Sequence, residues 1–335
     1  MSTRRTTLLT LSTALLAACG GGGGGGSAEA APPATPTPPP PPSPGWTRLA
    51  NLPAGRAKFG AAVVAGKVYA VGGYDTLRSV DVYDTAANTW AAGPALLSGT
   101  DNVAVMESGG RIHAIGGEAR TAHQLLDPAL GTWAAAPSSP AIRFASAAAV
   151  LGGRLHLVGG WNYSNTASNS VATHDVYDPV AGTWASAAPL ATRRNAAAAA
   201  VLDGKLYVIG GRAPGIRAGD QTSLASVEVY DPATDTWRAG PDLPAARSGA
   251  AAVVVAGRLY LLGGESTPGA VRDTVSRLDP ATGTWAELPR MPYAAHGLGA
   301  VVVGGAIVVM GGFSGPSDAV GTEVAQCWRY EPGAS

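Results

Sequence analysis

The chain has 335 residues, of which 46% are hydrophobic and 14% are charged, so it has enough apolar side chains to bury a sizeable core. Its 23 Lys and Arg residues balance its 23 Asp and Glu residues, and the formal net charge is zero. This balance argues against nucleic acid or an anionic membrane surface as the partner of the folded part.

Residues 1–18 have the pattern of a secretory leader. Two arginines, at positions 4 and 5, precede an apolar run at 8–18 that is too short to cross a bilayer as a helix. The run ends in LAACG at 16–20, which resembles a bacterial lipobox and implies that Cys19 is lipidated. Ordinary cleavage after small residues is the alternative, and it leaves Cys19 without a role. We expect an exported bacterial lipoprotein, anchored to an envelope membrane, with its folded part in the periplasm or on the cell surface.

Residues 19–45 predict a tether between the lipid and the folded part. Positions 20–26 are all glycine, and positions 32–44 are mostly proline. Glycine-rich chain is flexible, and proline-rich chain tends to extended polyproline II at about 3.1 Å per residue. Because Cys19 would carry the lipid, Cys327 is the remaining cysteine, and we expect no intramolecular disulfide.

Residues 46–335 contain one sequence frame repeated six times. Each copy opens with a Trp and closes with two glycines, and the second glycine lies 27 residues after the Trp in all six copies. The tryptophans are Trp46, Trp90, Trp133, Trp184, Trp237 and Trp285, and the pairs begin at Gly72, Gly116, Gly159, Gly210, Gly263 and Gly311. The connection to the next Trp varies from 16 to 26 residues. A fixed frame with one variable connection indicates a repeat array.

Each copy predicts four short strands. Apolar runs at 61–64 and 68–73 flank a Gly-Lys turn, which is typical of a hairpin. Residues 79–84 alternate as a third strand, and Asp-Pro at 231–232 marks a turn into a fourth strand that carries the Trp. Four strands in a unit of about 45 residues are typical of a propeller blade. We expect the glycine pairs to lie where the second strand ends near a crowded axis.

The last copy lacks its fourth strand. Residues 328–332 align with 228–232, and no strand with a Trp follows them, whereas such a strand stands alone at 46–49. We therefore predict that residues 46–49 complete the last blade and close the ring, which removes an exposed sheet edge.

The glycine pairs, the Tyr-Asp-Pro at 230–232, the tryptophans and their spacing resemble the Kelch repeat over residues 46–332. The resemblance implies an all-β, six-bladed Kelch propeller whose last blade is closed by the N-terminal strand. Copy two departs most from the pattern, with HQLLD at 123–127. In Kelch propellers the loops between second and third strands share a face with the segments that join blades, and this face usually carries the site.

We expect the functional face on the side of the long loops, at residues 161–170, 212–223, 265–273 and 313–320. Two sets of residues are expected to point there. Ten residues after the Trp, a place that we name the Arg position, four copies have an arginine: Arg56, Arg143, Arg194 and Arg247. Directly after the glycine pairs the residue differs in character from copy to copy: Tyr74, Glu118, Trp161, Arg212, Glu265 and Phe313.

The two sets have different interpretations. A repeated arginine is common in Kelch repeats and can be structural, bonding carbonyls of the neighbouring blade. The functional alternative is a basic crescent on copies three to five that binds a carboxylate or phosphate of an acidic ligand. In the varied set, Trp161 with Tyr163 offers an aromatic platform beside Asn162 and Asn165, which suits sugars or peptide segments, although Trp161 can also cover the base of its loop.

One loop has a narrower resemblance. The sequence GGESTPGAVRD at 263–273 is similar, with one residue more, to a Glu and Arg loop of bacterial Kelch-type sialic acid mutarotases. The resemblance implies that Glu265 acts as general acid or base and that Arg272 holds the sugar carboxylate.

No metal or cofactor is expected. His113 and His156 occupy a slot that is Tyr in other copies, His123 and His174 lie in third strands, and no histidine pair has the spacing of a zinc site. Cys327 lies in a third strand, which disfavours the Cys-Tyr copper site of Kelch-type oxidases. There is no Gly-x-Ser-x-Gly elbow, P-loop or dinucleotide fingerprint.

The sequence therefore favours a membrane-tethered binding module that uses the long-loop face to hold a protein segment or a glycan. One alternative is an isomerase of the mutarotase or epimerase type. Another is a structural part of an envelope complex. Strand pattern and charge do not separate the three, because propellers host all of these roles.

Overall fold

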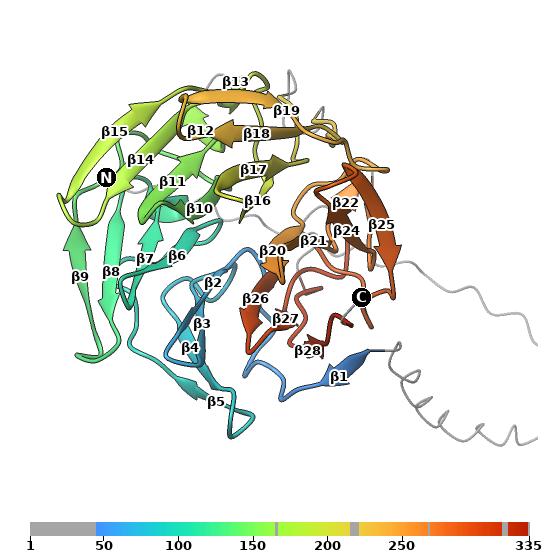
Figure 1. Cartoon of the computed structure of the whole chain (residues 1–335). Helices are drawn as coiled ribbons and strands as arrows, with labels where there is room; N and C mark the ends of the chain where they lie inside the picture. Colours follow the sequence, from blue (N-terminus) through green and yellow to red (C-terminus); the bar gives the residue numbers. More distant parts are fainter. Residues whose placement is uncertain (1–44, 165–166, 215–220, 267–268, 317–320, 334–335) are drawn as a thin grey trace, which may run out of the picture. The chain divides into compact units, whose positions relative to one another are not determined.

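The structure is a computed structural model that describes residues 45–164, 167–214, 221–266, 269–316 and 321–333. The leader, Cys19 and the tether up to residue 44 lie outside the described residues. The described strands form six four-stranded antiparallel sheets arranged around one axis as the blades of a propeller (Figure 1). This arrangement confirms the all-β, six-bladed fold that the repeat predicts.

Each blade has four strands, which are named below from the axis outward. Blade one contains β2 (Gly60–Val64), β3 (Lys67–Val71), β4 (Val80–Asp84) and β5 (Thr89–Ala92), and blade two contains β6 (Ala104–Ser108), β7 (Arg111–Ile115), β8 (His123–Asp127) and β9 (Thr132–Ala136). Blade three contains β10 (Ala147–Leu151), β11 (Arg154–Val158), β14 (His174–Asp178) and β15 (Thr183–Ala187), and blade four contains β16 (Ala198–Leu202), β17 (Lys205–Ile209), β18 (Val227–Asp231) and β19 (Thr236–Ala239).

Blade five contains β20 (Ala251–Val255), β21 (Arg258–Leu262), β24 (Val275–Asp279) and β25 (Thr284–Leu288). Blade six contains β26 (Gly299–Val303), β27 (Ala306–Met310), β28 (Cys327–Tyr330) and β1 (Trp46–Arg48). Outside the blades lie two hairpins, β12 (Trp161–Ser164) with β13 (Ala167–Ser170) and β22 (Glu265–Ser266) with β23 (Ala270–Val271), and a 3-10 helix (Gly117–Ala119). No helix in the described part is long and apolar enough to cross a membrane.

The core lies between blades. The first strands contact one another around the axis, and the second strands are covered on both faces by neighbouring blades (Figure 1). This explains why the second strands are almost continuously apolar, with Val68, Leu206 and Leu259 all 0% exposed.

Blade six is closed by the N-terminal strand, as the sequence predicts. β1 pairs with β28 in antiparallel register, with Trp46 opposite Tyr330 and Arg48 opposite Trp328. Trp46 is 4% exposed, and its ring centroid lies 4.9 Å from that of Tyr330. The pairing covers the edge that β28 would otherwise expose.

Each repeated Trp links its blade to the preceding one. The indole N–H donates to a carbonyl just after the outer strand of the preceding blade, at 2.7–3.4 Å in all six cases: Trp46 to Pro289, Trp90 to Ala50, Trp133 to Pro94, Trp184 to Pro137, Trp237 to Ala188 and Trp285 to Pro241. A Trp in every copy is therefore explained by the junctions between blades.

The glycine pairs make the other link between blades. The second glycine of each pair donates its N–H at 2.8–2.9 Å to the carbonyl at the Arg position of the next blade: Gly73 to Thr100, Gly117 to Arg143, Gly160 to Arg194, Gly211 to Arg247, Gly264 to Ala295 and Gly312 to Arg56. The first glycine of each pair has φ between 60° and 75°, and a Cβ there would come within 2.4–2.7 Å of the same carbonyl. The crowding expected at the end of the second strand is therefore present, and the close neighbour is the backbone of the next blade.

Candidate functional site

The end of the propeller that carries the long loops, which we name the mouth, is built on a closed ring of six backbone hydrogen bonds. One residue per blade, two positions after the Arg position, donates its N–H at 2.7–3.0 Å to the carbonyl of its counterpart in the preceding blade; these residues are Lys58, Asn102, Ala145, Ala196, Gly249 and Gly297. All six have φ between 48° and 61°. The ring holds the six blades in register around the axis.

The varied residues after the glycine pairs surround this ring. Four of them form antiparallel bridges with the residue that precedes the ring residue: Trp161 with Phe144, Arg212 with Asn195, Glu265 with Ser248 and Phe313 with His296. Tyr74 and Glu118 donate their backbone N–H groups to the equivalent carbonyls of Ala57 and Asp101. The structure thus brings all six predicted positions together at the mouth.

A cavity of about 250 Å³ lies at the mouth. Every blade contributes to its lining, for example through Lys58, Asn102, Phe144, Asn195, Gly249 and His296. Phe144 and Trp161, whose ring centroids are 6.1 Å apart, form an aromatic wall, and Arg212 and Gln221 add polar groups. Such a mixture of aromatic surface and a few polar side chains is typical of a ligand site.

Sequence reasoning missed most of the lining residues. Lys58, Asn102, Asn195 and His296 belong to the two positions that follow the Arg position, and Gln221 precedes the third strand of blade four. Their signal was available in the sequence, since these positions vary between copies while the flanking frame does not.

A polar cluster on one side of the mouth joins blades four, five and six. Glu265 is 3% exposed and forms an ion pair with Arg212, whose Nε donates to Ser248 Oγ at 3.0 Å. His296 Nδ1 lies 3.5 Å from Glu265 Oε1, and its Nε2 lies 3.1 Å from the carbonyl oxygen of Gly315. Because Nε2 must donate to that carbonyl, a hydrogen bond from Nδ1 to Glu265 requires the doubly protonated imidazolium.

A lysine lies beside this cluster, over the ring of Phe313, which stacks on His296. Lys58 Nζ lies 5.5 Å from the ring centroid of Tyr74 and 5.8 Å from that of Phe313. The two rings pack edge to face, with centroids 5.6 Å apart. Cation–π attraction therefore holds the ammonium group between blades one and six.

The arginines at the Arg position point into their own blades. Arg56, Arg143, Arg194 and Arg247 are 1–3% exposed. In blades one, three and four the guanidinium pairs with a third-strand carboxylate and donates to backbone carbonyls, and the pairs are Arg56–Asp81, Arg143–Asp175 and Arg194–Glu228. Burial lowers the pKa of these arginines, and the carboxylates counteract it. The carbonyls belong to the same blade, and the expectation of bonds to a neighbouring blade is wrong.

The remaining predicted site residues do not form the contacts that the sequence suggests. Arg272 donates to Ser266 Oγ at 3.3 Å, and the carboxylate of Glu265 is ion-paired with Arg212 instead. Glu118 is exposed on the 3-10 helix, and the side chain of Tyr163 lies outside the described part. Among the described residues, no group of three or more His, Cys, Asp or Glu side chains could hold a metal ion.

Four histidines form two buried pairs that sequence reasoning did not anticipate. His113 Nδ1 lies 2.8 Å from His123 Nε2 in blade two, and His156 Nδ1 lies 2.8 Å from His174 Nε2 in blade three. All four are 1–4% exposed, and burial is the main cause that lowers the pKa of each to about 4.

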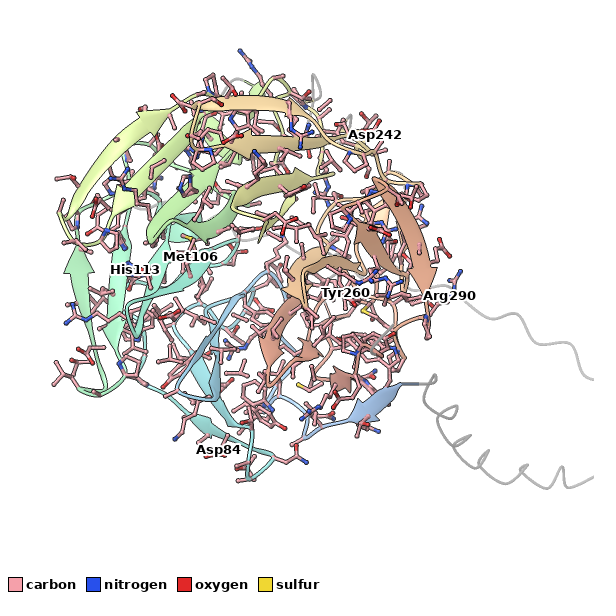
Figure 2. The ribbon with its side chains drawn as sticks, viewed as in Figure 1. Asp84, Met106, His113, Asp242, Tyr260 and Arg290 are labelled. Atoms are coloured by element: carbon pink, nitrogen blue, oxygen red, sulfur yellow. The ribbon has the colours of Figure 1, made fainter. Side chains whose placement is uncertain are left out.

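The pairs occupy a repeated slot between blades. His113 on β7 lies where blade five has Tyr260 on β21, and both are labelled in Figure 2. The strand beside it carries His123 where blade five has Val275. Blade two therefore has a His–His pair at the positions where blade five has Tyr and Val. The presence of His at both slots of copies two and three was the signal in the sequence.

Comparison with known proteins is consistent with this geometry. The KLHDC2/KLHL20/DRC7 Kelch-repeats domain matches residues 102–312, and the Kelch motif matches residues 55–97. Kelch-like protein 35 of Homo sapiens is 42% identical over 201 residues, which are 59% of this chain and 33% of that protein. Kelch-like protein 35 of Mus musculus is 26% identical over 235 residues, which are 69% of this chain and 31% of that protein. The chain thus spans about a third of the length of these relatives.

Among solved structures, that of YjhT aligns with a TM-score of 0.70 and 14% identity, and the alignment covers 83% of this chain and 95% of that chain. At this identity the likeness concerns the fold alone. The two family matches together cover most of the six-bladed part and include the glycine pairs that link the blades. The chain belongs to the Kelch-repeat family of β-propellers.

Proposed function

We propose that the protein is a membrane-tethered binding module whose mouth holds a segment of a partner protein. The observation that carries the proposal is the 250 Å³ cavity, to which all six blades contribute side chains or backbone. Membership of the Kelch family supports a protein partner, because Kelch propellers generally bind proteins.

The size of the cavity indicates how a partner would bind. Sites that enclose drug-sized ligands have volumes of roughly 300–1,000 Å³, and this cavity is slightly smaller. We infer that one anchoring side chain enters it, while the flanking residues of the segment lie on the long loops. The aromatic wall of Phe144 and Trp161 would contact the apolar part of that side chain.

The polar lining favours an anchor that accepts hydrogen bonds. Lys58, Asn102 and Gln221 carry side-chain N–H groups at the cavity, Asn195 Nδ2 donates to Ser170 Oγ at 2.7 Å, and the charge of Arg212 is balanced by Glu265. A carboxylate or an amide carbonyl at the end of the anchor fits this lining. An acidic peptide segment is therefore the partner that we propose.

Replacement of Lys58 tests the mouth as the binding surface. The full chain in detergent is probed on a peptide array and a glycan array, and hits are titrated by fluorescence anisotropy. Lys58→Met should weaken binding of an acidic peptide by roughly 10- to 100-fold, because a hydrogen bond from a charged donor contributes about 1.5–3 kcal/mol. Lys67→Met is the matched control, since Lys67 begins β3 at the opposite end of the blade and is exposed. Equal affinities of the two variants would contradict the proposed surface, and hits confined to the glycan array would replace the protein partner by a glycan.

The membrane anchor is proposed from the LAACG sequence at 16–20. Cys19→Ala should move the protein from the detergent-rich phase to the aqueous phase in a phase-separation assay on cell extracts. Cys327→Ala is the control, because Cys327 is buried in blade six and should not affect partitioning. A Cys19→Ala protein that stays in the detergent-rich phase would contradict lipidation at this cysteine.

A further inference from the structure

Blade five differs from the other blades that have an arginine at the Arg position. In blades one, three and four the second residue of the third strand is an acid that pairs with the arginine, namely Asp81, Asp175 or Glu228. In blade five the equivalent residue is Ser276. Arg247 therefore keeps its buried place without the carboxylate that its counterparts have.

In the described surroundings of Arg247, the hydroxyl of Ser276 stands in place of the carboxylate. Its Nη1 donates to Thr274 Oγ1 at 3.0 Å and its Nη2 donates to Ser276 Oγ at 2.9 Å. Arg247 is 2% exposed, and its buried Nε, like that of Arg56 in blade one, has no hydrogen-bond partner among the described residues. A guanidinium that is removed from water without an opposite charge is costly to the folded state.

A second arginine adds to the positive charge at Arg247. Arg272 lies two residues before Thr274, and its Nε is also buried without a hydrogen-bond partner in the described part of the chain. The pKa of Arg247 is lowered to about 10, first by burial and then by the charge of Arg272, so Arg247 remains charged at neutral pH. The acid whose charge raises the pKa of Arg247 is Glu287. It is exposed, and among the described residues it forms no ion pair with either arginine.

We propose that blade five binds a small monovalent anion, of the size of chloride, between the guanidinium groups of Arg247 and Arg272. The anion would take the role that a carboxylate has in blades one, three and four. Ser276 has one hydroxyl oxygen where Asp81 and Asp175 have the three heavy atoms of a carboxylate, which limits the ligand to a small ion. The hydroxyls of Thr274 and Ser276 accept from Arg247 and can direct their own hydrogens to the anion. This site lies inside a blade and does not depend on the proposed function of the mouth.

Halide titration of the full chain in detergent tests the proposal. The protein is dialysed into sodium gluconate, whose anion is too large for the site, and gluconate is replaced by chloride or bromide at constant ionic strength. The Tm of the wild type should rise saturably, by roughly 5 °C at about 100 times Kd. Ser276→Asp restores the acid found in blades one and three, and it should have a higher Tm in gluconate and no response to halide. Asp175→Ser should have a lower Tm in gluconate but no response to halide, because blade three has Val171 where blade five has Arg272.

Two results would overturn the site. One is a halide response of the same size in the wild type and in Ser276→Asp, which would make it a general salt effect. The other is the absence of any response in the wild type. If Ser276→Asp fails to fold, crystals of the wild type grown with bromide decide the question: an anomalous peak between Arg247 and Arg272 supports the site, and its absence contradicts it.

Discussion

Gly210→Ala should destabilise the protein by roughly 3–5 kcal/mol, whereas Gly204→Ala, in the same blade, should cost about 1–2 kcal/mol. Both glycines have positive φ, 60° at Gly210 and 68° at Gly204, so both variants carry the strain of a left-handed alanine. They differ in what the new Cβ would meet. At Gly204 nothing lies within 4 Å, whereas at Gly210 the carbonyl oxygen of Arg247 lies at 2.4 Å.

The larger cost has a structural cause at the junction of blades four and five. To relieve the clash, the backbone at Arg247 must move away, and this weakens the 2.9 Å hydrogen bond from Gly211 N–H to the Arg247 carbonyl. The carbonyl of Gly210 also accepts from Arg194 at 2.9 Å, so a shift there disturbs a buried guanidinium. Urea unfolding of the two variants measures the difference. Equal destabilisation would mean that the glycine pair is required for its φ alone.

The fold was predictable because the repeated residues act between neighbouring copies. The Trp and the second glycine of each copy form hydrogen bonds to adjacent blades, so both are needed at a fixed spacing in every copy. The same logic predicts the closure by β1, since the last copy lacks the Trp that the junction with blade five requires. A fixed spacing in the sequence is enough to predict these contacts, because each of them recurs in all six copies.

The site was only partly predictable because its contacts occur once. The frame places Arg212 and Glu265 around the mouth, but it does not tell which acid binds which base. The sequence does contain a signal that the buried arginines point into their own blades. Arg56 and Arg143 occur in copies whose third strand has an acid at its second position, and copies two and six lack both the arginine and the acid. Such pairing within a copy is stronger evidence for structure than the repetition of the arginine.

The two histidine pairs should make the propeller sensitive to mild acid. His123 Nδ1 donates to the Pro137 carbonyl, so its Nε2 accepts from His113, and this pair is satisfied with both rings neutral. Each of the four histidines has a pKa of about 4 in the folded protein, compared with about 6.5 in the unfolded chain. Below pH 6.5 the unfolded state therefore binds more protons, and stability falls as the pH decreases toward 4.

The size of this effect is large for a folded domain. Each histidine contributes a loss of up to about 3 kcal/mol between pH 6.5 and 4, so the four together approach the whole unfolding free energy of roughly 5–15 kcal/mol that is usual for a domain. The turn carboxylates act at lower pH. Backbone N–H groups lower the pKa of Asp84 and Asp178, and the hydrogen bond from Lys205, followed by a backbone N–H, lowers that of Asp231. The stabilisation from these carboxylates is lost only as they become protonated in stronger acid.

Exchange of one pair isolates the contribution of the histidines. Blade four has Tyr207 and Val227 in the slots that blade three fills with His156 and His174, so the double variant His156→Tyr with His174→Val copies a pair that this fold already accommodates. Urea unfolding between pH 7.5 and 4.5 should show about half of the acid-dependent loss of the wild type, with little change at pH 7.5. Near His174, Asp235 opposes the lowering of its pKa and Arg143 adds to it, and both remain in the variant. An unchanged pH dependence in the double variant would mean that the histidines stay solvated. A halved pH dependence would assign unfolding in mild acid to the two histidine pairs.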